Sequence, residues 1–308
     1  MQKLILCIFA LIVTSVVLSD NIKAAEAGTI SGTAKIDGVG TSAVKITAES
    51  VNTDPAIGYQ VTTSGTGGTW SMTVTNGQTY SVDGMKSTAT HGRVSNVNGN
   101  GQSGVNHNLV SRPTPLPDVV FKIAADEEFR TQYGTSWQST AINKLNMAEP
   151  WFLTEHGIDF VVISATNFYA WSSNNNALGC GGPNPPDPTN YLHPEVRSES
   201  GWNSGTYNGA DILIAFTRQS ISDADGCANV PGSGGTHPAI VVQDAPSSGD
   251  LTRVIMHEIT HTYGFNHDSS CNFEPSIMLT PNNLLCSNFI KNWRPAHDDT
   301  LETRRSWY

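Results

Sequence analysis

Residues 257–268 read HEITHTYGFNHD, and this stretch determines the fold class and the chemistry expected of the chain. His257 and His261 are four residues apart, so a helix would place both imidazoles on one face. Gly264 allows the chain to leave that helix through a left-handed turn, which would bring His267 back as a third nitrogen ligand. Three protein ligands with a fourth position open to water are typical of a catalytic zinc site rather than a structural one.

Glu258 follows the first of these histidines, where it could accept a proton from a water molecule at the open position. A structural zinc site has no need of this glutamate. The preceding segment predicts a helix, because Asp250 suits an N-cap and the next residues carry an apolar stripe, Leu251, Val254, Ile255, Ile259 and Tyr263. The pattern therefore predicts a zinc-dependent peptidase that holds one catalytic Zn²⁺ and takes a protein or peptide as its substrate.

The first 27 residues have the pattern of a secretory signal peptide. Lys3 precedes an apolar stretch from Leu4 to Leu18, and the small-residue pattern Ala25-Glu26-Ala27 follows it. The apolar run is short for a membrane span of ~20 residues, and no other stretch is apolar enough to cross a bilayer. We expect cleavage after Ala27 and a secreted, extracellular protein, with the periplasm as the alternative compartment.

Four cysteines remain after the predicted signal peptide, namely Cys180, Cys227, Cys271 and Cys286. An even number in a secreted chain favours two disulfides, and four cysteines permit three pairings. Cys271 and Cys286 bracket the segment after the zinc motif, so we favour 271–286 and hence 180–227. The alternative is that some of them remain free, buried thiols.

The formal net charge of −10 argues against nucleic acids and anionic membrane surfaces as partners. Residues 223–226 (DADG) suggest a Ca²⁺ loop, but two carboxylates are too few, and an Asn/Asp-type turn is the better interpretation. The other histidines after the signal have no mutual ligand spacing, and we expect them at the surface or in loops: His91, His107, His156, His193, His237 and His297.

The region 28–111 predicts an all-β sandwich, because short β-prone runs recur between turn signals. The turns are marked by Asp37-Gly38, Gly67-Gly68 and Asn76-Gly77. This layout resembles the small carboxypeptidase-regulatory-like or transthyretin-like modules found beside bacterial secreted enzymes. The expected strands are residues 29–36, 43–51, 59–64, 69–74 and 79–85, with a loop at 98–104.

The Pro-rich segment 112–117 predicts a stiff, extended linker, and residues 118–308 form the second domain. Strands alternate there with helical segments, which indicates an α/β (α+β) architecture. We expect strands at 119–126, 158–166, 211–217 and 239–244, a long helix over 127–156 with a break near Gly134, and loops over 172–210 and 231–236.

From Asp118 to Tyr308 the chain resembles the metzincin superfamily, and within it the adamalysin (reprolysin) branch. HEITHTYGFNHD fits the extended metzincin zinc signature, and Asp268 after the third histidine is typical of adamalysins. Met278 ends the tripeptide SIM, at the place expected for the Met-turn. Residues 226–230 (GCANV) and 239–244 (AIVVQD) resemble the edge strand and the following strand that lead into the active-site helix.

The resemblance implies a metzincin-like fold in which Met278 forms an apolar floor beneath the imidazoles and is not a ligand. Asp268 would hold the loop of the third ligand through hydrogen bonds. Thr280 stands where the tyrosine-liganded branches carry a tyrosine, so no further ligand is implied.

Two alternatives were weighed against this interpretation. A gluzincin would use Glu274 or another downstream acid as the third ligand, but His267 and the Met-turn spacing argue against that. An extracellular adhesin or carbohydrate-binding protein would place the function in residues 28–110, with a glycan or matrix ligand, and the intact Glu258 disfavours it.

Overall fold

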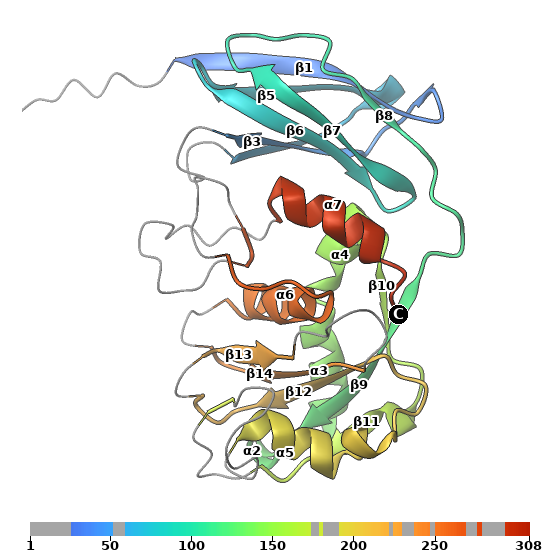
Figure 1. Ribbon diagram of the computed structural model, residues 1–308, viewed down its shortest axis with the longest axis vertical. Coiled ribbons are helices and arrows are strands. Elements are labelled where there is room, and N and C mark those ends of the chain that lie inside the picture. The colour runs from blue at the N-terminus through green and yellow to red at the C-terminus, as the bar shows by residue number, and fades with distance from the viewer. Residues whose placement is uncertain are drawn as a thin grey trace, which may run out of the picture.

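The structure is a computed structural model that describes residues 26–51, 59–173, 179–180, 191–221, 224–229, 237–246, 250–268, 276–278 and 293–308. It has a strand-rich N-terminal region and a second region in which helices cover both faces of a mixed sheet (Figure 1). Helix α7 (Pro295–Arg304) lies between the two regions. No helix within the described ranges is both long and apolar enough to cross a bilayer.

The N-terminal region contains two four-stranded sheets. One has the order β2-β1-β5, with β8 also paired to β1, and the other has the order β4-β3-β6-β7. The strands are β1 (Ala27–Ile36), β2 (Val39–Gly40), β3 (Lys45–Ser50), β4 (Tyr59–Thr63), β5 (Thr69–Thr75), β6 (Thr79–Lys86), β7 (Ala89–Asn98) and β8 (His107–Leu109). The five strands expected from the sequence are present, and β2, β7 and β8 were not predicted.

Both sheets contribute to one apolar core. In β5, Trp70, Met72 and Val74 are buried while the residues between them are exposed, because successive side chains of a strand point to opposite faces. These three residues share a buried cluster with Ile46 of β3 and Val82 of β6, which belong to the other sheet. The packing of two sheets through one core agrees with the alternation of polar and apolar residues in the sequence.

The second region is built on a sheet of order β10-β9-β12-β14-β13, with β11 also paired to β9. All its pairings are parallel except that of β13 with β14. The strands are β9 (Asp118–Ala125), β10 (Asp159–Val161), β11 (Phe168–Ala170), β12 (Ile212–Thr217), β13 (Gly226–Ala228) and β14 (Ala239–Gln243). Strand β13 therefore forms an edge of the sheet within the described residues.

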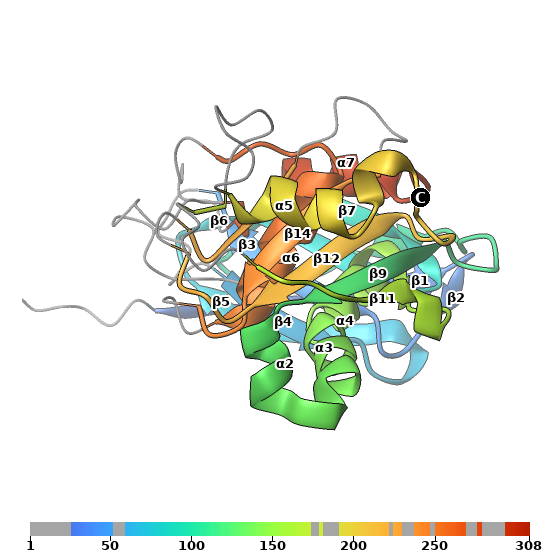
Figure 2. The same cartoon turned by 90° about the horizontal axis from the view of Figure 1, so that it is seen from below.

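The strands of this sheet are apolar on both faces, as expected for parallel strands covered by helices. In β12, Ile214 packs in the cluster that includes α3 and α6, whereas Leu213 packs in the cluster that includes α5. Figure 2 shows α5 in front of β12 and β14, with α6 behind them. The helices are α2 (Glu127–Tyr133), α3 (Trp137–Leu145), α4 (Glu149–His156), α5 (Leu192–Glu199) and α6 (Leu251–Thr262).

Two expectations for this region were wrong in part. The expected long helix over 127–156 is three helices, because a second break follows Leu145 and Pro150 lies in the first turn of α4, where its missing N–H is tolerated. The expected loop over 172–210 contains α5, whose Leu192 and Val196 are buried against the sheet. The expected strand at 158–166 contains β10 alone, and the chain pairs again with β9 as β11.

The two regions contact each other through α4, α7 and the strands β6 and β7. Arg112, placed by the sequence in the linker, is buried at this contact. Its guanidinium donates to the carbonyl oxygens of Ser87 at 3.0 Å and Glu155 at 2.9 Å, and it pairs with Glu302 of α7. The start of the expected linker is thus anchored on both regions.

Candidate metal centre

Helix α6 carries the first two histidines of the motif and begins as the sequence predicts. The side chain of Asp250 accepts a hydrogen bond from the backbone N–H of Arg253, which satisfies a free donor at the helix N-terminus. The helix ends at Thr262, and Gly264 follows with φ +84°, in the left-handed region that favours glycine. The predicted turn after the helix is therefore present.

The three motif histidines converge. The Nε2 atoms of His257, His261 and His267 lie 3.1 Å from one another in all three pairs. The Nδ1 atoms of His257 and His261 lie 2.7 Å from the carbonyl oxygens of Ile277 and Phe265, so each Nδ1–H donates there. Their Nε2 atoms consequently carry lone pairs, and two lone pairs cannot form a hydrogen bond with each other.

A bound cation would remove the repulsion between these lone pairs, because all three Nε2 atoms could then bind it. Nitrogen ligands about 2.0–2.1 Å from a tetrahedral zinc ion lie roughly 3.3–3.4 Å apart, close to the separation in the triad. The donor set of three imidazole nitrogens also suits zinc. The residues present therefore fit a Zn²⁺ ion, and the exposure of His267 leaves one side of the centre open to solvent.

The protonation of the histidines agrees with a ligand role. Burial, and next to it the neighbouring His261, lower the pKa of His257 to about 3. Burial likewise lowers the pKa of His261 to about 4 and shifts that of His267 downward. All three imidazoles are thus neutral at pH 7, which is the form that binds a metal.

Glu258 is buried on α6, and its Oε2 atom has no hydrogen-bond partner among the described residues. Burial raises the pKa of this carboxyl group to about 8, while Arg253 opposes the shift. A group with a pKa near neutrality can both accept and release a proton at pH 7. The predicted base therefore lies in an environment suited to proton transfer.

Gly226 of β13 lies directly against this glutamate. A Cβ atom at Gly226 would come within 3.0 Å of Glu258 Oε1 and 2.9 Å of Val254 Cγ1. The sequence placed Gly226 in an edge strand but did not identify this contact. The sequence feature that could have indicated this contact is the glycine at the start of the strand, since such a glycine often marks a close approach of two segments.

Asp268 connects the loop of the third histidine to the segment that contains Met278. Its backbone N–H donates to the carbonyl oxygen of Met278 at 3.0 Å, and the hydroxyl of Ser276 donates to its carboxylate at 2.5 Å. Arg294 forms an ion pair with the same carboxylate at 2.9 Å. Met278 itself is fully buried in the core beside α6.

The Cys180–Cys227 disulfide expected from the sequence is present, with 5.9 Å between the Cα atoms. It attaches the edge strand β13 to the segment before α5. Cys271 and Cys286, the other expected pair, lie outside the described residues, as does Asp223 of the considered calcium loop.

The expectation for the remaining histidines was wrong for five of them, since His91 lies in strand β7 with a side chain only 5% exposed and four others are buried as well. His107, His156, His193 and His297 are buried, not at the surface. Their apolar neighbours come from distant parts of the chain, so local spacing gave no sign of this burial. His91 and His156 also take part in clusters of carboxylates that are described below.

Among known proteins, a family model gives the match that identifies a family. The family model described as metallo-peptidase family M12 (Reprolysin_5) matches residues 118–288. No curated protein matches. Among solved structures, a chaperone-substrate complex shares 12% identity with a TM-score of 0.42, over 77% of this chain and 39% of that chain. Metalloproteinase-II from Bacteroides fragilis shares 14% identity with a TM-score of 0.33, over 63% of this chain and 55% of its own. The chain thus spans less than two thirds of either structure.

Proposed function

This chain belongs to metallo-peptidase family M12, and on that premise we propose that it is a zinc-dependent endopeptidase of the adamalysin type. The observation that carries the proposal is the triangle of three Nε2 atoms at 3.1 Å beside the buried Glu258. Asp268 after the third histidine supports the adamalysin branch, because its contacts with Ser276 and Arg294 hold the loop of that ligand in place.

His257, His261 and His267 would hold the zinc ion. When bound, zinc supplies Lewis-acid activation of the attacking water and of the peptide carbonyl. Glu258 accepts the proton of the attacking water and then passes it to the nitrogen of the departing amine. The carbonyl oxygens of Ile277 and Phe265 fix the imidazole tautomers, so that each Nε2 faces the centre.

Strand β13 is proposed as the binding site for the main chain of the substrate. It pairs with β14 on one side only, within the described part of the sheet, and its Gly226 lies against Glu258. An extended peptide could add to this edge by β-augmentation, and its main-chain hydrogen bonds would not depend on side-chain identity. A peptide bound along this edge could extend beyond the metal centre on both sides. It would then be cut at an internal bond, as an endopeptidase cuts.

We further propose that the protein is secreted after removal of residues 1–27 and consists of a β-sandwich module (28–111), a linker (112–117) and the peptidase domain (118–308). The Cys180–Cys227 disulfide supports an oxidising compartment. The shared core of the two N-terminal sheets supports the sandwich. The N-terminal module would then act as an accessory to the peptidase.

The decisive experiment measures cleavage of denatured casein by the full chain and by Glu258→Gln, each analysed for bound zinc. We expect cleavage to fall at least ~10²-fold in the variant, since proton transfer by a positioned side chain contributes about 10²–10⁴-fold, while zinc content stays unchanged. Glu199→Gln, the same substitution at an exposed position of α5, should retain full activity. Removal of zinc with a chelator should abolish cleavage, and Zn²⁺ should restore it.

Unchanged cleavage by Glu258→Gln would disprove the role of this residue. Absence of cleavage by every sample that contains zinc would instead favour a binding function of the N-terminal module.

A further inference from the structure

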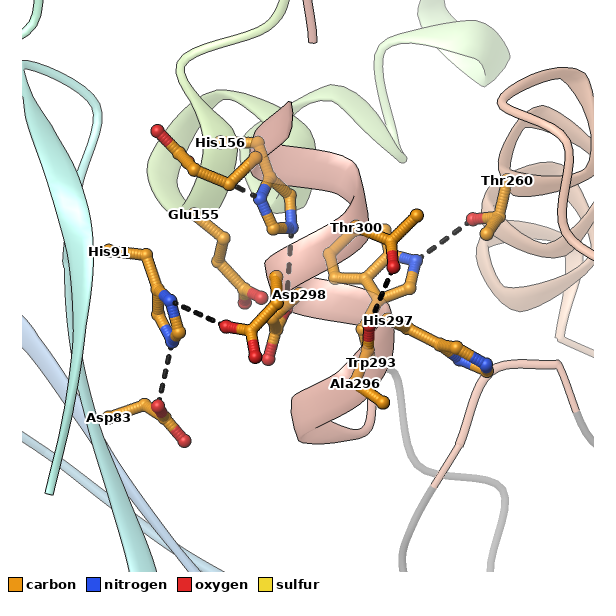
Figure 3. A network of polar contacts seen from close by, with 12 residues as sticks. Asp83, His91, Glu155, His156, Thr260, Trp293, Ala296, His297, Asp298 and Thr300 are labelled. Carbon is orange, nitrogen blue, oxygen red and sulfur yellow. Dashed lines mark hydrogen bonds and ion pairs between the residues drawn. The ribbon is translucent and has the colours of Figure 1, made fainter. Parts of the chain in front are cut away.

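A second group of metal-binding side chains lies where the N-terminal region contacts the peptidase region. Glu155 and His156 end helix α4, and Asp298 lies in the first turn of α7. One ligand atom from each of these three residues lies within 4.8 Å of the others. Figure 3 shows both carboxylates and the imidazole converging between α4, α7 and the strand that carries His91.

These three side chains are buried, and several of their polar atoms lack hydrogen bonds. Glu155 and His156 have 0% exposure and Asp298 has 1%. Glu155 Oε2, Asp298 Oδ1 and both ring nitrogens of His156 have no hydrogen-bond partner among the residues that the structure describes. A buried polar atom without a partner is costly, and a buried charge is more so. A group bound by all three side chains would satisfy these atoms and remove that cost.

The surrounding lysine and arginine side chains do not pair with the atoms that lack hydrogen bonds. Lys45 pairs with the other oxygen of Glu155. Arg93 pairs with Asp83 and Asp299, each at 2.8 Å, and approaches Asp298 only to 3.9 Å. Four lysine or arginine side chains, with Arg112 and Arg305 as the other two, thus face five carboxylates: Asp83, Glu155, Asp298, Asp299 and Glu302. The contact carries an excess of negative charge.

We propose that Glu155, His156 and Asp298 bind a divalent transition-metal cation of the Zn²⁺ type, separate from the histidine triad. His156 Nε2 and Asp298 Oδ1 lie 3.4 Å apart, and two ligand atoms about 2.1 Å from a tetrahedral zinc ion have roughly this separation. One imidazole with two carboxylates is also a donor set suited to zinc. A double positive charge would compensate the excess of carboxylates.

An overlapping group, Asp83, His91 and Asp298, is a weaker candidate. His91 Nε2 already lies 2.7 Å from Asp83 Oδ1, and Arg93 donates to the same oxygen. These atoms are satisfied without a metal. We therefore assign Asp83 and His91 to the surroundings of the cation, where they belong to β6 and β7 of the N-terminal region.

The proposed cation would be structural and would fix α4 and α7 to each other. The ring of His156 packs edge-on against Trp293 with 5.0 Å between centroids, and Trp293 Nε1 donates to Thr260 Oγ1 at 2.9 Å. Thr260 directly precedes His261 on the active-site helix (Figure 3). Loss of the cation should therefore loosen the support behind that helix.

The test is the zinc stoichiometry of the full chain after dialysis against buffered Zn²⁺, measured by elemental analysis. We expect two zinc ions per chain in the unmodified protein and one in His156→Gln and in Asp298→Asn. Asp299→Asn is the matched control, because Asp299 is the next residue of α7 but its side chain is 61% exposed, and this variant should keep two. His257→Gln combined with His261→Gln should keep one, at the proposed site.

The proposal would be overturned if the unmodified protein held one zinc ion per chain and lost it on substitution of the triad. The excess of carboxylates would then be neutralised by bound protons instead of a metal. Near-UV circular dichroism identifies any variant that fails to fold. An independent measurement then needs no variant: a crystal of the unmodified chain grown with Zn²⁺ should show an anomalous peak among Glu155, His156 and Asp298. Absence of that peak would also refute the site.

Discussion

Gly226→Ala is expected to damage catalysis without removing the metal. The added Cβ atom would lie 3.0 Å from Glu258 Cγ and Oε1 and 2.9 Å from Val254 Cγ1, whereas ordinary contacts lie at 3.4–4 Å. At least 0.4 Å of overlap must therefore be relieved. Both neighbours belong to α6 and are buried, so the glutamate must shift or β13 must move away from the helix.

The expected magnitude follows from this overlap. Overpacking of a buried contact costs about 1–3 kcal/mol of stability. A displacement of a reacting group by ~1 Å can cost about 10²-fold in rate, so a shift of roughly half that should lower kcat/KM by about tenfold or more. Zinc content should remain unchanged, because the three atoms nearest to the added Cβ belong to Val254 and Glu258 and not to the histidines. The assay is kcat/KM on a fluorogenic peptide, with zinc analysis and urea unfolding.

Gly65→Ala is the control, because its added Cβ would meet nothing closer than 3.7 Å and its φ of −87° suits alanine. It should preserve both activity and stability. Full activity and normal stability in Gly226→Ala would refute the reasoning, since the edge strand could not then lie against Glu258 as described.

Three further predictions concern the loop of the third ligand, a buried histidine and the disulfide. Asp268→Asn weakens the ion pair with Arg294, so zinc affinity should fall about 10–100-fold in a competition titration with a chelator. Burial lowers the pKa of His193 to about 4, so the folded state excludes a proton that the unfolded state binds below its usual value of 6.5. The free energy of unfolding should therefore decrease as pH falls from 6.5 to 4, by up to about 3 kcal/mol from this residue. Urea unfolding at both pH values should show a smaller decrease for His193→Gln; an equal decrease contradicts the assignment. Cys180→Ser with Cys227→Ser opens a link between residues 47 apart, which should cost about 4 kcal/mol by the loop-entropy relation, measured by urea unfolding. A change below about 1 kcal/mol would show that the disulfide contributes little.

The metal centre could be predicted from the sequence because its information is local. Spacing by four on a helix, a glycine for the turn and a histidine after it specify how three side chains meet, whatever the rest of the chain does. Asp250 as the N-cap of α6 is equally local. The strands of the central sheet were found for a similar reason, since buried parallel strands are continuous apolar runs.

The features that the sequence did not reveal depend on tertiary contacts. Helix α5 has a polar composition, and it is stabilised by Leu192 and Val196 packed on the sheet. The contact of Gly226 with Glu258 joins a strand to a helix across the sheet edge. The cluster of Glu155, His156 and Asp298 unites residues more than 140 positions apart, so no local pattern could indicate it.

The position of α7 has a consequence for the order of events during biosynthesis. Trp293, which precedes α7, donates to Thr260 of α6, and Asp298 and Glu302 of α7 pair with Arg93 of β7 and with Arg112. Translation produces α7 after all these partners, and domains made early fold first. The two N-terminal sheets can form while the rest is being synthesised, but the support behind the histidine helix cannot. A nascent chain that stops before α7 should therefore lack this support for the histidine helix, which delays any proteolysis until α7 has been synthesised.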